Sequence, residues 1–139
     1  MLARREYARA ELALRLAATG AEHDEVERVL DELQDAGYLS DARYADAVVR
    51  SRAGSYARRA IAHSLRERGV TKEVANQALA GLPGDEFEQA QALWQRRFGT
   101  PPVDEREKAR QLRFLVARGF SPTVAFRVLK TAGAAVEEP

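Results

Sequence analysis

The stretch QLRFLVARGFSPTVAFRVLK, residues 111–130, decides the fold. Gly119 lies at its centre, with one leucine four residues before it and another ten residues after it. Two other glycines have leucines at the same two distances, which gives the sets Leu16, Gly20, Leu30 and Leu65, Gly69, Leu79. The three glycines are 49 and 50 residues apart. A period near 50 is typical of stacked supersecondary units.

Each repeated segment reads as a helix, a glycine turn and a second helix. Leu12 and Leu16 form an apolar stripe at helical spacing before Gly20, and Val26 and Leu30 form another after it. The glycines stand where the end of a helix needs a residue in the left-handed conformation. The sequence therefore predicts a helical hairpin around each glycine.

Residues that favour a helix start predict where the remaining helices begin. Thr71, and Ser121 followed by Pro122, predict the start of the second helix in two of the hairpins. Capping boxes are predicted for Asp85 with Glu88 and for Asp104 with Glu107. Further helices are predicted at about 41–53 and 85–97, each ahead of a hairpin.

The predicted fold class is therefore all-α, with eight helices in tandem three-helix repeats. The first repeat, residues 1–38, lacks most of its leading helix because few residues precede the hairpin. The second repeat spans 39–83 and the third 84–133, and 134–139 is predicted to be a disordered tail.

Charge is segregated along the chain despite a net charge of +1. Residues 20–41 hold eight acids and one base, residues 50–72 seven bases and one acid, and residues 94–130 nine bases and three acids. Such blocks affect partners and association rates, not the fold.

The composition excludes several classes of protein. There is no cysteine, and no apolar run approaches the roughly 18 residues of a membrane helix. The N-terminal sequence lacks the apolar stretch of a signal peptide, so we expect a cytoplasmic protein without membrane contact. No phosphate-binding loop and no zinc-protease motif is present, and His23 and His63 lack metal-ligand spacing. We predict a non-enzymatic binding protein without cofactor or metal.

Basic residues recur at matching places in the repeat. Arg9, Arg58 and Lys108 each stand eleven residues before their glycine. Recurrent cations on successive repeats would form a stripe suited to a polyanion. Tyr56 lies beside Arg58, and Trp94 and Phe98 lie beside Arg96 and Arg97. These aromatic residues could stack on nucleobases, although a core position is favoured for Trp94 and Phe98.

An alternative explanation is that cations at helix ends offset the helix dipole. It accounts for Arg50 and Arg52 equally well, but less well for Arg59 and Arg66, which lie seven residues apart in one helix. The predicted DNA or filament contacts are Arg50, Arg52, Arg58, Arg59, Arg66, Arg106, Arg110, Arg113 and Arg118.

The acids of residues 22–35 follow the outer face of a helix, so a solvated face is favoured over a catalytic pair. Among them, Glu25, Asp31 and Glu32 are the predicted contacts with a basic protein surface.

Four strings together resemble the RecX family of bacterial recombination regulators. They are LARREYARAEL near the start, LDELQDAGYLSDARYADAVVRSR at 30–52, LRERGV at 65–70 and QLRFLVARGFSPTVAFRVLK at 111–130. They occur in the family's order over essentially the whole chain. Two departures are a short loop, residues 53–57, where the family often has a longer one, and the nearly absent first leading helix.

The resemblance implies an elongated, curved array of three three-helix units. It implies a regulator in homologous recombination, DNA repair and the SOS response, which binds the groove of the RecA–DNA filament and suppresses recombinase and ATPase activity. Weak, non-specific binding to single- and double-stranded DNA is also implied, and we expect a monomer. The alternatives are a free-standing DNA-binding module of helix-turn-helix type and a helical adaptor for another protein.

Overall fold

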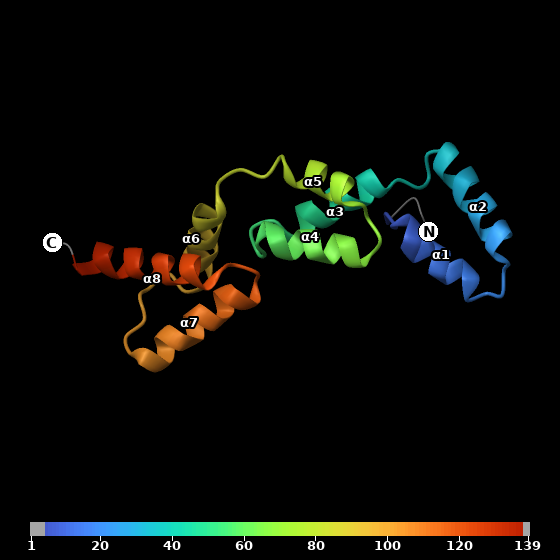
Figure 1. Cartoon of the computed structure of the whole chain (residues 1–139). Helices are drawn as coiled ribbons and strands as arrows, with labels where there is room; N and C mark the ends of the chain where they lie inside the picture. Colours follow the sequence, from blue (N-terminus) through green and yellow to red (C-terminus); the bar gives the residue numbers. More distant parts are fainter. Residues whose placement is uncertain (1–4, 138–139) are drawn as a thin grey trace. The chain divides into compact units, whose positions relative to one another are not determined.

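The computed structural model describes residues 5–137 and contains, within them, eight α-helices and no strand (Figure 1). In chain order these are α1 (Arg9–Ala17), α2 (His23–Asp35), α3 (Asp41–Arg52), α4 (Arg58–Glu67), α5 (Lys72–Leu79), α6 (Glu86–Arg97), α7 (Glu105–Ala117) and α8 (Pro122–Glu137). The predicted all-α fold is confirmed. None of the helices in the described part is long and apolar enough to cross a membrane.

The three repeat glycines adopt the left-handed conformation that the sequence predicts. Their φ angles are 94° at Gly20, 86° at Gly69 and 98° at Gly119. At the last of these turns, the N–H of Phe120 donates to the carbonyl of Leu115 at 3.2 Å, which closes the end of α7. Each turn thereby reverses the chain into the second helix of a hairpin.

The predicted helix starts are confirmed at α5 and α8. The hydroxyl of Thr71 accepts from the backbone N–H three residues on at 3.3 Å, and the hydroxyl of Ser121 does the same at 3.2 Å. Pro122 is the first residue of α8, where its missing N–H costs nothing.

The two predicted capping boxes differ. The first is complete, since Asp85 accepts from the N–H of Glu88 at 2.8 Å and Glu88 accepts from the N–H of Asp85 at 3.0 Å. For the second, the prediction is wrong for one of the two hydrogen bonds, the bond from the cap backbone to Glu107. Asp104 accepts from the N–H of Glu107 at 2.8 Å, but the Glu107 carboxylate accepts from Arg110 instead of the cap backbone. A nearby guanidinium is the stronger donor because it is charged.

Two compact units make up the molecule, and each has its own core. The first contains residues up to Ser51 together with Ile61–Gly81, and the second contains Arg52–Ala60 together with the chain from Leu82 onward. The first turn of α4 therefore belongs to the second unit and the rest of α4 to the first. Packing in the chain does not follow the repeat boundaries.

The larger of the two cores lies in the second unit and positions the helices that carry much of the candidate site. It consists of Ala57, Ala90, Leu93, Trp94, Leu115, Phe120, Ala125, Val128 and Leu129. The indole N–H of Trp94 donates to the side-chain oxygen of Gln111 at 2.8 Å, and Gln111 is only 1% exposed. The favoured core position of Trp94 is confirmed, so this ring is not available for base stacking. Phe98 is also packed against the core and meets Phe114 edge-on at 5.3 Å.

In the first unit, a smaller core joins α1 and α2. Val26, Leu30 and Leu39 are its buried members, and Leu12 and Leu16 pack against it. The apolar stripes predicted on either side of Gly20 meet in this core.

A repeated contact explains why the compact units cut across the repeats. A Cβ on Gly69 would lie 2.5 Å from the Cβ of Ala10 in α1, and a Cβ on Gly119 would lie 2.7 Å from the Cβ of Ala60 in α4. The turn of each later hairpin thus packs on the first helix of the preceding hairpin. The arginines before these glycines reinforce the contact, because Arg68 pairs with Glu11 at 3.2 Å and Arg118 donates to the carbonyl of Ser55 at 3.0 Å.

The ends of the repeats differ in one place from the sequence-based expectation. No helix precedes α1 within residues 5–8. However, α8 continues to Glu137, whereas a disordered tail was predicted from residue 134. Residues 134–136, Ala-Ala-Val, contain no helix breaker, so the helix continues through them. The last two residues of the predicted tail lie outside the described part.

Candidate nucleic-acid and filament interface

Four of the predicted contact arginines are exposed, and their guanidinium groups have no partner among the described residues. Arg50 lies on α3, Arg66 at the end of α4, and Arg106 and Arg113 on α7, and all four are exposed. Within residues 5–137 their side chains make no hydrogen bond or ion pair. Arg106 and Arg113 are seven residues apart, about two helical turns, so they share one face of α7. These four positions retain full positive charge for an external anion.

Two other predicted arginines are paired with carboxylates. Arg59 meets Glu86 at 2.9 Å, and Arg110 donates twice to Glu107, at 2.9 Å each. The hydrogen bond from Arg110 lowers the pKa of Glu107, and the same bond raises the pKa of Arg110. An anion approaching either arginine must therefore compete with an internal carboxylate.

Arg58 and Arg118 hold the protein's own backbone. Arg58 donates to the carbonyl of Leu82, and Arg118 donates to the carbonyl of Ser55 with its guanidinium 4.8 Å from the Tyr56 ring centroid. Arg52 lies over the same ring at 5.5 Å. These contacts join the 52–57 loop and the start of α4 to the rest of the second compact unit. They are structural roles that the spacing of the bases does not reveal.

The pairing of Arg110 leads to a testable expectation for Glu107→Gln. Neutralising Glu107 releases Arg110 for a phosphate, so the affinity for single-stranded DNA should rise about 5-fold at 0.1 M salt. The plot of log affinity against log salt should also become steeper by about 0.7. A salt titration followed by fluorescence anisotropy measures both quantities.

The matched control is Glu105→Gln, an exposed acid on the same helix that forms no ion pair with another described residue. It changes the net charge by the same amount without releasing an arginine. Equal gains in the two variants would mean that overall charge, and not the pairing of Arg110, controls affinity.

The predicted acidic contacts also divide into exposed residues and residues held in an internal ion pair. Glu25 and Glu32 are exposed on α2. Asp31 pairs with Arg9 at 2.9 Å, and Glu27 pairs with the same guanidinium at 3.2 Å. The hydrogen bond to Asp31 is the main cause of the raised pKa of Arg9. Asp31 therefore links α1 to α2 through Arg9. Glu25 and Glu32 are exposed and available to a partner protein.

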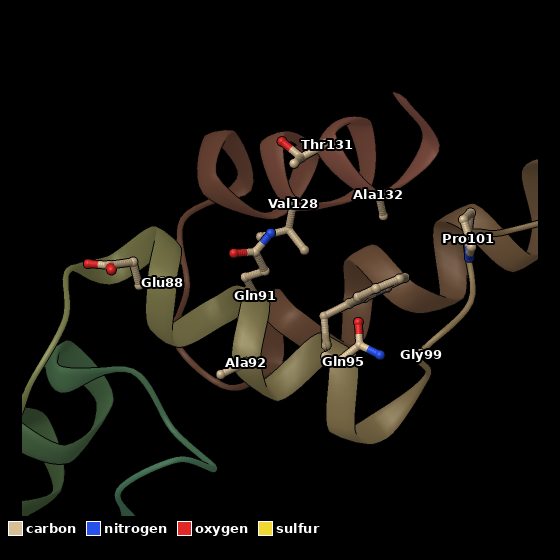
Figure 2. Close-up of a pocket in the computed structure, with 10 residues that line it drawn as sticks. Glu88, Gln91, Ala92, Gln95, Gly99, Pro101, Val128, Thr131 and Ala132 are labelled. Atoms are coloured by element: carbon tan, nitrogen blue, oxygen red, sulfur yellow. The ribbon is translucent and has the colours of Figure 1, made fainter. Parts of the chain in front are cut away.

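A hollow between α6 and α8 is lined mostly by amide and apolar side chains, with Glu88 as the one carboxylate among its described residues. Its volume is about 610 Å³, and Figure 2 shows Gln91 and Gln95 of α6 facing Val128 and Ala132 of α8 across it. Glu88 at its edge already accepts from the N–H of Asp85 in the capping box. In the described part of the chain, no group of three metal-ligating side chains is brought together.

Apart from Lys108, a basic and aromatic cluster on α7 and α8 was missed by the reasoning from repeats. It contains Lys108, Phe126, Arg127 and Lys130, of which Phe126, Arg127 and Lys130 are exposed. A signal was present, because the buried stripe of Ala125, Val128 and Leu129 leaves position 126 facing outward.

Two protein-family models match this chain. The model described as the second three-helix domain of RecX matches residues 40–79, and the model described as the third three-helix domain matches residues 84–129. The chain belongs to the RecX family. The resemblance seen in the four sequence strings is thereby confirmed.

Curated relatives match this chain over most of their own length. The regulatory protein RecX of Leptothrix cholodnii is 47% identical over 131 residues, which cover 94% of this chain and 83% of that protein. The regulatory protein RecX of Ralstonia nicotianae is 40% identical over 137 residues, covering 99% and 86%. Both relatives are named as regulatory proteins and not as enzymes.

A solved structure shares the fold. The crystal structure of RecX from Lactobacillus salivarius aligns with a TM-score of 0.71, covering 96% of this chain and 90% of that one at 18% identity. The helical repeat architecture of this RecX chain is therefore that of an experimentally determined RecX.

Proposed function

We propose that this RecX protein regulates the RecA recombinase by binding the groove of the RecA–DNA filament and suppressing its recombinase and ATPase activities. Family membership supports a regulator, and the relatives carry that word in their names. The protein acts in the cytoplasm as a monomer, binds single- and double-stranded DNA weakly and without sequence preference, and catalyses no reaction.

The observation that carries the DNA part of this proposal is the set of exposed, uncommitted arginines. Arg50, Arg66, Arg106 and Arg113 present fixed positive charge on three helices and are not neutralised by internal carboxylates of the described residues. Surface arginine is suited to phosphate because its planar fork donates two hydrogen bonds. The exposed acids Glu25 and Glu32 on α2 supply the opposite charge for a basic patch on a recombinase protomer.

The test is DNA-stimulated ATP hydrolysis by RecA, with this protein titrated in at substoichiometric amounts. A filament regulator should lower the rate steeply well below one copy per RecA protomer. A protein that merely competes for DNA should need near-saturating amounts. No fall in rate, even in excess and at low salt, would refute filament regulation.

A free-standing DNA-binding module is the second candidate, because each repeat contains two helices joined by a tight glycine turn. A helix-turn-helix protein would dimerise and prefer a particular duplex sequence. Competition between unrelated duplexes, combined with sedimentation analysis, distinguishes this candidate from the filament regulator.

A further inference from the structure

A mostly apolar groove lies along α8, within the second compact unit. Its volume is about 580 Å³. Pro101 and Pro102 from the α6–α7 connection and Leu129 of α8 contribute apolar lining, and Phe126 projects at its side. A volume of this size accommodates a nucleotide-sized ligand.

Phe126 is the aromatic side chain that the fold leaves free in this groove. It is 51% exposed, because its helical neighbours Ala125, Val128 and Leu129 occupy the core-facing stripe of α8. The ammonium group of Lys108 lies 5.8 Å from its ring centroid. Phe126 is not among the buried core residues of this unit, and about half of its surface is available to an external ligand.

The charge around the groove is of one sign. Lys108, Arg127 and Lys130 line it, and the lining residues that the structure describes include no carboxylate. Arg127 is held in place by the Phe87 ring, whose centroid is 4.1 Å from the guanidinium carbon. A flat apolar ring among three cations complements a nucleotide, which carries both a flat base and a phosphate.

We propose that this groove binds single-stranded nucleic acid, with one unpaired base against Phe126 and neighbouring phosphates at Lys108, Arg127 and Lys130. This inference deepens the DNA-binding part of the proposed function and rests on it. It gives the protein a preference for unpaired strands, since the bases of a duplex are already stacked on one another and cannot reach the ring. Trp94 and Phe98, predicted from sequence as possible stacking residues, pack in or against the core.

The experiment compares three probes by fluorescence anisotropy with the full chain. They are a labelled oligothymidylate, a strand of equal length with abasic sites throughout, and a duplex. The wild-type protein should bind the thymidylate more tightly than the abasic strand. Phe126→Leu keeps an apolar side chain but removes the ring, so affinity for thymidylate should fall roughly 10-fold while affinity for the other two probes is unchanged. Phe126→Trp should restore the difference.

Tyr38→Leu is the matched control, because Tyr38 is an aromatic residue that is 58% exposed and lies outside the groove. It should leave all three affinities unchanged. Circular dichroism of each variant checks that the helices are intact.

Each outcome bears on a different claim. If Phe126→Leu leaves the difference between thymidylate and abasic strand unchanged, the groove is not a base-binding site, although the arginine surface and filament regulation stand. If the wild-type protein binds no single-stranded DNA, both the groove and the DNA part of the proposed function fail. Binding of poly-glutamate that Phe126→Ala abolishes and Phe126→Leu retains would assign the groove to an acidic peptide and overturn the inference.

Discussion

Replacing Gly119 by alanine is expected to destabilise the second compact unit by about 3 kcal/mol, whereas Gly20→Ala should cost about 1 kcal/mol. Both glycines have φ angles above 90°, so the left-handed backbone alone costs an alanine about 1–2 kcal/mol, partly offset by a less flexible unfolded chain. The atoms around each glycine account for the difference between the two free-energy costs. No atom lies within 4 Å of a Cβ on Gly20, but a Cβ on Gly119 would lie 2.7 Å from that of Ala60 and 3.3 Å from that of Ala57.

The alanines in contact with Gly119 cannot rotate away, because a methyl group has no χ angle to change. The backbone of α4 must shift instead, and overpacking of this kind adds about 1–3 kcal/mol. Urea unfolding followed by the fluorescence of Trp94 measures the effect directly, because Trp94 is the chain's single tryptophan and lies in this core. Gly20 lies in the first compact unit, so Gly20→Ala is followed by the loss of helical circular dichroism instead. A loss of only about 1 kcal/mol for Gly119→Ala, no more than the left-handed backbone costs, would show that the close packing of the turn on α4 does not hold in solution.

The same contact shows where sequence reasoning about the fold reaches its limit. The spacing of Leu115, Gly119 and Leu129 depends on local helical geometry, so it predicts the hairpin and the left-handed turn correctly. Which helix the turn packs on depends on residues about 60 positions away, such as Ala57 and Ala60, and small residues carry no distinctive pattern. The repeat was therefore predictable, but the packing of one hairpin turn on the preceding hairpin was not.

The candidate site was predictable to a similar degree. Periodicity places Arg106 and Arg113 on an outer face of α7, and both are exposed. It does not show that Arg59 pairs with Glu86, 27 residues along the chain, or that Arg58 is used to hold a backbone carbonyl. Side chains separated by such distances meet through tertiary packing, which the charge pattern of one segment does not encode.

The second large effect is expected for Arg106→Ala combined with Arg113→Ala, which should lower the affinity for single-stranded DNA about 25-fold at 0.1 M salt. Each neutralised phosphate contributes roughly 5-fold at this salt concentration, because its condensed counterion is released on binding. The slope of log affinity against log salt should fall by about 1.4. Since both side chains are exposed and make no hydrogen bond or ion pair among the described residues, the unfolding free energy should be unchanged.

The control for net charge is Arg15→Ala combined with Arg28→Ala, two exposed arginines on α1 and α2, the latter within the acidic segment. It removes the same two charges from the first compact unit and should lower affinity less than the α7 variant does. An equal loss in both would mean that net charge, and not the α7 pair, controls binding. If the α7 pair acts on the filament as well as on bare DNA, the concentration that halves RecA ATP hydrolysis should rise in the α7 variant alone. A loss of DNA affinity with unchanged inhibition would instead mean that α7 serves the free strand and that the recombinase is recognised by another surface. In that case the acids Glu25 and Glu32 on α2 become the residues to reverse in charge.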